Sequence, residues 1–273
     1  MANSINTNYG AQIALQNLNA TNKALETTQN RVNTGLKVAT AKDNGAIFAI
    51  ATTQRADMAA QDAVKNSLQR GQSIVDVALA AGDTIIAALE EMKSLAVSIQ
   101  SSTGDTQAAY LKDFNAMGQE ILDAMGGASF DGANLWTTAS TGATEISVVK
   151  DTAGGKVVLG KATATNGEAA ITTVASATPV AAAAATTANV QAAIDAVTGA
   201  LSTFGTQSKS IGRQLTFVGK LQDALETGVG NLVDADLAKE SARLTALQTK
   251  QQLGVQALSI ANQSSSILLG LFR

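Results

Sequence analysis

The sequence predicts a mainly α-helical protein, built as a long antiparallel coiled-coil rod with a small β-hairpin element and with terminal helices that pair into a coiled coil. Three observations support this fold class: two long apolar repeats of seven residues, weaker repeats at both ends, and one β-branched stretch near the middle. Apolar residues that recur every 3.5 residues over several heptads indicate helices that wind around one another.

The strongest repeat covers residues 190–232, where only Ser208 and Gln222 interrupt the apolar seam. At about 1.5 Å per residue, a helix of this length spans on the order of 65 Å. A second seam of sevens within residues 46–100 is the expected partner, and small residues such as Gly71 would let the two backbones approach closely. The expected rod core consists of Leu68, Val75, Ile85, Leu89, Met92, Ile99, Val197, Leu201, Phe204, Ile211, Leu215 and Leu225.

Both ends of the chain carry weaker seams, which polar residues such as Asn22 and Gln251 interrupt. Polar residues in a seam weaken a two-helix core and suit register-setting contacts with other chains. Ordering a backbone costs about 1–2 kcal/mol per residue, so we expect these ends to be disordered in the monomer and to fold only on assembly. The expected assembly residues are Ala11, Leu15, Leu18, Leu25, Val32, Leu237, Leu244, Leu247, Leu258 and Leu268.

The predicted domain boundaries follow the breaks in helical periodicity. Residues 1–42 and 234–273 are expected to form the inner coiled-coil domain, whereas residues 43–188 and the returning helix 189–233 are expected to form the rod domain. The first rod segment is predicted to contain helices 46–100 and 106–125, a β-hairpin at 140–161, and a low-complexity connection at 162–188 with an alanine-rich helical start at 181–185.

Composition excludes most catalytic and binding classes. The chain has no histidine and no cysteine, which removes disulfides, thiolate or imidazole metal sites and histidine-based triads. A net charge of −3 with 3% aromatic residues argues against nucleic-acid binding. The string Gly155–Ala162 is close to a phosphate-binding loop but has alanine where the Mg²⁺-binding hydroxyl belongs, which favours a hairpin strand. We therefore expect no enzyme activity, no catalytic residues, no cofactor and no metal.

The chain start lacks the basic region and apolar core of a cleavable signal peptide, and no uninterrupted apolar run approaches the ~18 residues that span a bilayer. We expect no membrane insertion. The protein is expected to be either cytosolic or exported by a route that needs no cleaved leader.

Several separate motifs, in the same order along the chain, resemble those of bacterial flagellin. They are Ile5–Asn8, Asn33–Ala46, Met92–Val97, the Phe130–Gly132 turn, and the end from Asp234 to Arg273. The resemblance covers essentially residues 1–135 and 190–273, and the short connection at 162–188 implies a minimal subunit without large outer domains.

The resemblance implies a structural subunit that self-assembles into the flagellar filament for motility. It implies export in an unfolded state through the flagellar type III channel, an extracellular location, and polymerisation through folding of the terminal helices. The implied partners are copies of the chain itself, the export apparatus, a chaperone, and the filament cap and hook-junction proteins. The alternative is a related axial or secretion-tip helical protein that binds another partner.

One stretch departs from the family pattern. Flagellins that the innate-immune Toll-like receptor detects carry Gln-Arg and, three residues after the arginine, Glu, whereas this chain has Glu90, Glu91 and Ser94. Replacing an arginine with Glu91 reverses the charge at a contact, which opposes binding. We expect poor receptor activation.

Overall fold

The computed structural model describes residues 8–137, 146–160 and 168–270, and side chains within 264–270 are outside that description. Long helices dominate, and the mainly helical class is confirmed. The helices are α1 (Tyr9–Thr34), α2 (Gly45–Ser101), α3 (Gly104–Gly127), α4 (Glu168–Val174), α5 (Thr187–Val233) and α6 (Leu237–Gly270). Two short antiparallel strand pairs are present, β1 (Ser129–Phe130) with β2 (Ala133–Asn134) and β3 (Ser147–Val149) with β4 (Lys156–Val158).

The chain forms two compact units, which we call the terminal unit (Met1–Ala56 with Ala224–Arg273) and the central unit (Asp57–Asp223). The predicted helices 46–100 and 106–125 correspond to α2 and α3, and the repeat at 190–232 corresponds to α5. The predicted boundary after residue 42 lies in the loop before α2 and that after residue 233 lies at the end of α5, whereas the compact units divide within α2 and α5.

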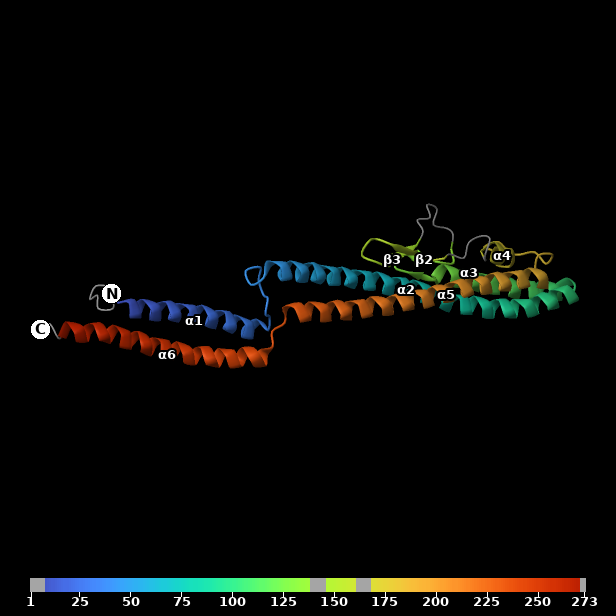
Figure 1. Cartoon of the computed structure of the whole chain (residues 1–273). Helices are drawn as coiled ribbons and strands as arrows, with labels where there is room; N and C mark the ends of the chain where they lie inside the picture. The colour runs from blue at the N-terminus through green and yellow to red at the C-terminus, as the bar shows by residue number, and fades with distance from the viewer. Residues whose placement is uncertain (1–7, 138–145, 161–167, 271–273) are drawn as a thin grey trace. The chain divides into compact units, whose positions relative to one another are not determined.

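In the central unit, α2 and α5 lie side by side along an apolar core that also receives α3 (Figure 1). Interruptions of the α5 seam are matched by polar residues of α2: Gln72 Nε2 donates to Ser208 Oγ at 2.6 Å, and Gln222 Nε2 donates to Asp62 Oδ1 at 2.7 Å. The predicted core residues that the structure buries are Leu68, Val75, Ile85, Leu89, Met92, Ile99, Val197, Phe204 and Ile211. Leu201 and Leu215 are partly buried against this core, and Leu225 is partly buried in the terminal unit.

The single tryptophan, Trp136, closes the core where α2 and α5 meet. Its side chain is fully buried, and its Nε1 donates to the Ala78 backbone oxygen at 2.7 Å. Its ring meets that of Phe204 edge-on, with centroids 5.4 Å apart. Gly82 makes room for this packing, because a Cβ there would lie 2.8 Å from the Trp136 ring and would overlap Leu201. Trp136 was not among the predicted core residues.

Gly71 has a different role from the one predicted. A Cβ at Gly71 would lie 2.7 Å from Cγ1 of Val148, so the glycine admits the hairpin strand β3 rather than the α5 backbone. Val148 is buried there, and the Val149 amide donates to Ser67 Oγ at 2.9 Å. The hairpin therefore docks onto α2.

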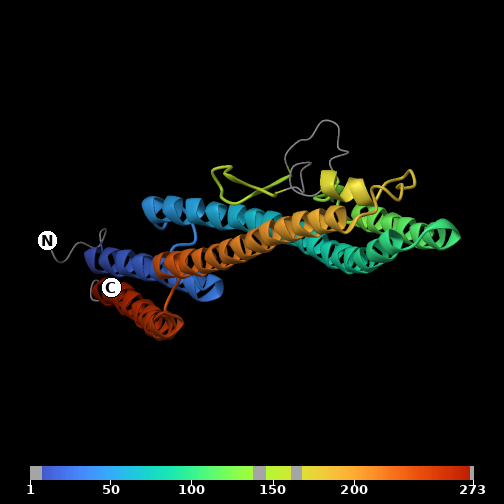
Figure 2. The same ribbon diagram turned by 90° about the vertical axis from the view of Figure 1, so that its right-hand side faces the viewer.

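Strands β3 and β4 and the described part of the connection, residues 168–186, lie over the helices of the central unit (Figure 2). Strands β3 and β4 pair Ser147 with Val158 through Val149 with Lys156; the predicted hairpin residues 140–145 and 161 lie outside the described residues. The predicted helical start at 181–185 is wrong: residues 182–184 form a turn, and the helix is α4. The connection is not only a surface segment, because it buries Ile171, Val174, Ala175, Val180 and Ala185.

Within the described residues, one helix, α2, is long and apolar enough over part of its length to cross a bilayer by composition alone. Core helices of water-soluble proteins pass the same test. Many of its apolar side chains from Val64 to Ile99 belong to the central core, where they pack with side chains of α3 and α5, whereas Val97 is exposed.

Candidate assembly surface on the terminal helices

Helices α1 and α6 are the elements expected to mediate assembly, and in the terminal unit they pack along each other. Helix α1 is capped by Asn8, whose side chain accepts from the Ala11 amide at 3.0 Å, and it ends at Gly35, which takes the left-handed conformation at φ 71°. Helix α6 is capped by Asp236, whose Oδ1 accepts from the Lys239 amide at 3.1 Å. The start and end of α1 and the start of α6 are therefore each set by a local residue, namely Asn8, Gly35 and Asp236.

A short backbone junction ties the end of α1 to the start of α6. Leu36 pairs with Asp234 in an isolated antiparallel bridge. The Lys37 amide donates to the Val233 oxygen at 2.6 Å, and the Ala235 amide donates to the Gly35 oxygen at 2.8 Å. Because the C-terminal end of α1 thus meets the N-terminal end of α6, the two helices run antiparallel.

Three polar contacts bridge α1 and α6 at intervals along the pair. Arg31 Nη1 lies 3.1 Å from Glu240 Oε1, and Gln251 Nε2 donates to Asn22 Oδ1 at 2.8 Å. At the far end, Asn8 Nδ2 donates to the Ala261 oxygen at 2.6 Å. The interruptions Asn22 and Gln251 thus pair with each other within the chain.

The apolar seam between the two helices is thin. Thr28 is the buried residue of α1, and Glu240 is the only buried residue among the described side chains of α6. Leu15 and Leu237 are about half exposed, at 48% and 49%. Leu268 lies in α6 where no side chain is described. The other expected assembly residues, which are partly buried, are Ala11, Leu18, Leu25, Val32, Leu244, Leu247 and Leu258.

Large apolar side chains instead point outward from both terminal helices. Tyr9 and Ile13 of α1 are 72% and 42% exposed, and Ile260 of α6 is 68% exposed. Leu253 and Val255 of α6 are also exposed. These exposed apolar side chains, on helices that bury little within the chain, make the pair a candidate interaction surface.

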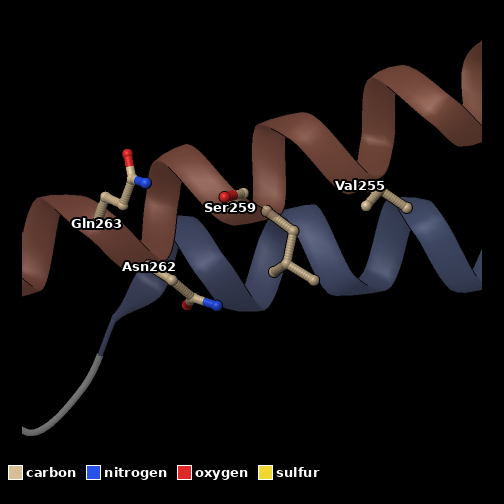
Figure 3. A pocket seen from close by; sticks show the side chains of 5 residues that line it. Val255, Ser259, Asn262 and Gln263 are labelled. Atoms are coloured by element: carbon tan, nitrogen blue, oxygen red, sulfur yellow. The ribbon is translucent and has the colours of Figure 1, made fainter.

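A shallow hollow accompanies these side chains on α6. It is lined by Val255, Leu258, Ser259, Asn262 and Gln263 and has a volume of about 450 Å³ (Figure 3). Its labelled polar side chains, Asn262 and Gln263, project on different sides of the helix and do not converge on one point. Within the described residues, no group of three acidic side chains could hold a metal ion. The hollow is therefore suited to packing rather than to chemistry.

The loop between α1 and α2 is organised by Asp43. Its Oδ2 accepts from the Thr40 amide at 2.9 Å, from the Thr40 hydroxyl at 3.1 Å and from the Ala39 amide at 3.1 Å. The bond from the Thr40 amide, supported by the hydroxyl and by nearby Arg31, holds the pKa of the Asp43 carboxyl below its ordinary value of 3.8.

The residues that depart from the receptor-binding pattern lie on α2 in the central unit. Glu90, Glu91 and Ser94 are all exposed, whereas their neighbours Leu89 and Met92 are fully buried. The three side chains are thus free to meet another protein without disturbing the core.

Comparison with known proteins identifies the family. A family model of the bacterial flagellin N-terminal helical region matches residues 5–141, and one of the C-terminal helical region matches residues 187–272. The chain is 50% identical to flagellin FljK of Caulobacter vibrioides and 38% identical to a flagellin of Brucella melitensis, with 99% of each chain covered in both comparisons. It is 36% identical to flagellin C of Rhizobium meliloti over 99% of each chain. With both helical regions present in order and relatives matched along their whole length, this chain belongs to the bacterial flagellin family.

Proposed function

We propose that this chain is a structural subunit of the extracellular flagellar filament, and that packing between neighbouring copies completes its terminal helices. Membership in the flagellin family supports the filament role and a structural rather than enzymatic protein. The observation that carries the second part is the burial pattern of α1 and α6, on which Thr28 and Glu240, both polar, are the buried residues among the described side chains.

The helix pair is stable alone only if the free energy gained by burying apolar surface exceeds the cost of ordering its backbone. Fixing each backbone residue costs about 1–2 kcal/mol, and burying apolar surface returns about 25 cal/mol per Å². The seam between α1 and α6 contributes little free energy of this kind, because its leucines are only partly buried or half exposed and most large apolar groups of the pair stay in water. Adding copies of the same chain against Tyr9, Ile13 and Ile260 would supply the missing burial.

The weak pairing of the terminal helices also supports export of the chain before assembly. Terminal segments that do not hold together alone present little folded structure to a narrow channel. In the family, such subunits leave the cell unfolded with the help of an export apparatus and a chaperone and are added beneath a cap. We extend those partners to this chain as part of the proposal.

The test is polymerisation of full-length protein against two kinds of variant. Removal of about 35 residues from each end should abolish filaments in negative-stain microscopy, while the central unit remains helical by circular dichroism. Helical signal of the full chain should rise on polymerisation.

Point variants separate surface packing from loss of the helices. The double variant Ile13→Asn, Ile260→Asn changes outward apolar side chains and should raise the concentration needed for assembly. The matched control Gln12→Asn, Gln256→Asn changes exposed polar residues on the same two helices and should assemble like the parent. Equal assembly of both double variants would contradict the proposal, as would resistance of residues 8–34 and 237–263 to protease in dilute monomer.

A further inference from the structure

We infer that the ion pair between Arg31 and Glu240 sets the register of α1 against α6, that is, which turn of one helix faces which turn of the other. The inference concerns pairing within one chain and rests on the proposed function only in that assembly is where the pair must be correct. It assigns these two side chains a role that the apolar seam cannot fill.

Apolar burial discriminates poorly between alternative registers of this pair. A seam repeated in sevens presents similar side chains after a shift of one or two turns, and here its leucines are only partly buried. The polar contact between Asn22 and Gln251 lies at exposed or half-exposed positions, so its loss in a shifted pair is made up by water.

The buried carboxylate of Glu240, by contrast, has a single partner on α1. Glu240 is the only acidic residue of α6, and the only cations of α1 are Lys23 and Arg31. A slip of one turn, about 5.4 Å, would take Glu240 away from Arg31 without bringing Lys23 opposite, because Lys23 is more than two turns away. Glu240 is 8% exposed, and a buried carboxylate without its partner strongly disfavours the shifted state.

The ion pair lies at the end where α1 and α6 are joined, which strengthens its effect on their register. Arg31 is in the last turn of α1 and Glu240 is in the first turn of α6, where each charge is favoured by its own helix dipole. The backbone bridge between Leu36 and Asp234 lies beside it. Register fixed at this joined end propagates outward along both helices.

Disulfide trapping reads the register directly, because the chain has no cysteine of its own. A Cβ at position 254 would lie 3.9 Å from the Leu18 Cβ, within the range of about 3.5–4.5 Å that a disulfide needs. The pair Leu18→Cys, Gly254→Cys therefore reports the native register. The pairs Leu18→Cys, Lys250→Cys and Leu18→Cys, Leu258→Cys report slips of one turn in either direction.

Each reporter is oxidised in three backgrounds: parent, Arg31→Met with Glu240→Gln, and the control Lys23→Met, which removes the other α1 cation. Soluble and sedimented protein are scored separately, so that failure to polymerise counts against the proposed function while register is still read. We expect the ratio of slipped to native crosslink to rise about tenfold in the double variant and to stay at the parent value in the control. An unchanged ratio in the double variant, or an equal rise in the control, would overturn the inference.

Discussion

Replacing Gly82 with valine tests the packing of α2 against α5 at its tightest point. A Cβ there would stand 2.8 Å from the Trp136 ring and 3.0 Å from Leu201 Cγ, whereas carbon atoms pack at about 3.5–4.0 Å. Overpacking of this kind costs about 1–3 kcal/mol, and the better helix propensity of valine returns roughly 0.5 kcal/mol. We therefore expect a net loss of about 0.5–2.5 kcal/mol in the free energy of unfolding of the central unit.

The matched control is Gly199→Val on α5, where a Cβ would meet nothing within 4 Å. It should be neutral or stabilising by roughly 0.5 kcal/mol. Urea unfolding of soluble monomer, followed by circular dichroism, gives both values. Leu201→Ala in the Gly82→Val background should recover part of the loss, because it removes one of the overlapping groups. Equal effects of the two valine variants, or strict additivity with Leu201→Ala, would refute the close-approach argument.

Three further outcomes are expected. Trp136→Phe should destabilise the central unit by about 1–3 kcal/mol, through the lost bond to Ala78 and the space left behind, and denaturant unfolding measures it. Since the pKa of Asp43 is lowered in the folded state, its carboxylate supports the 39–43 turn above pH 3.8 and loses that effect as the pH falls below this value. The amide signals of Ala39 and Thr40 should therefore shift in nuclear magnetic resonance spectra as the pH falls through this range. The same signals should not shift in the Asp43→Asn variant. Restoring the receptor pattern with Glu90→Gln, Glu91→Arg and Ser94→Glu should raise Toll-like receptor activation in reporter cells, and equal potency of parent and variant would contradict this expectation.

The helices of the central unit were predictable because their signal is both local and long. Seam residues such as Leu68, Ile85 and Phe204 recur in sevens over many turns, and the structure buries them. The hairpin between residues 147 and 158 was predictable for a similar reason, because β-branched runs flank a glycine-rich turn. Such patterns show which face of an element is apolar, and burial follows from that.

The contacts that were not predicted join segments far apart in the sequence. The heptad pattern of one segment does not indicate which other segment packs against it. Gly71 stands at a seam position where a small residue would let two helices approach closely. Nothing in the neighbouring sequence indicates that Val148, rather than α5, occupies the space beside it. Trp136 follows a tight turn and belongs to no repeat, so its place against Phe204 depends on tertiary structure alone. A lone tryptophan in a chain with 3% aromatics was the available signal, since large aromatic side chains dominate the packing energy wherever they are buried.

The two units show opposite uses of polar residues in a heptad seam. In the central unit, polar contacts such as that of Gln72 with Ser208 lie beside an extensive apolar core, so apolar burial dominates the packing there. On helices α1 and α6 of the terminal unit, the buried residues among the described side chains are Thr28 and Glu240, so polar contacts carry the specificity while large apolar groups such as Ile260 remain exposed. The ion pair between Arg31 and Glu240 would then select the register of α1 against α6 as the two helices form, and packing against neighbouring copies would stabilise that register.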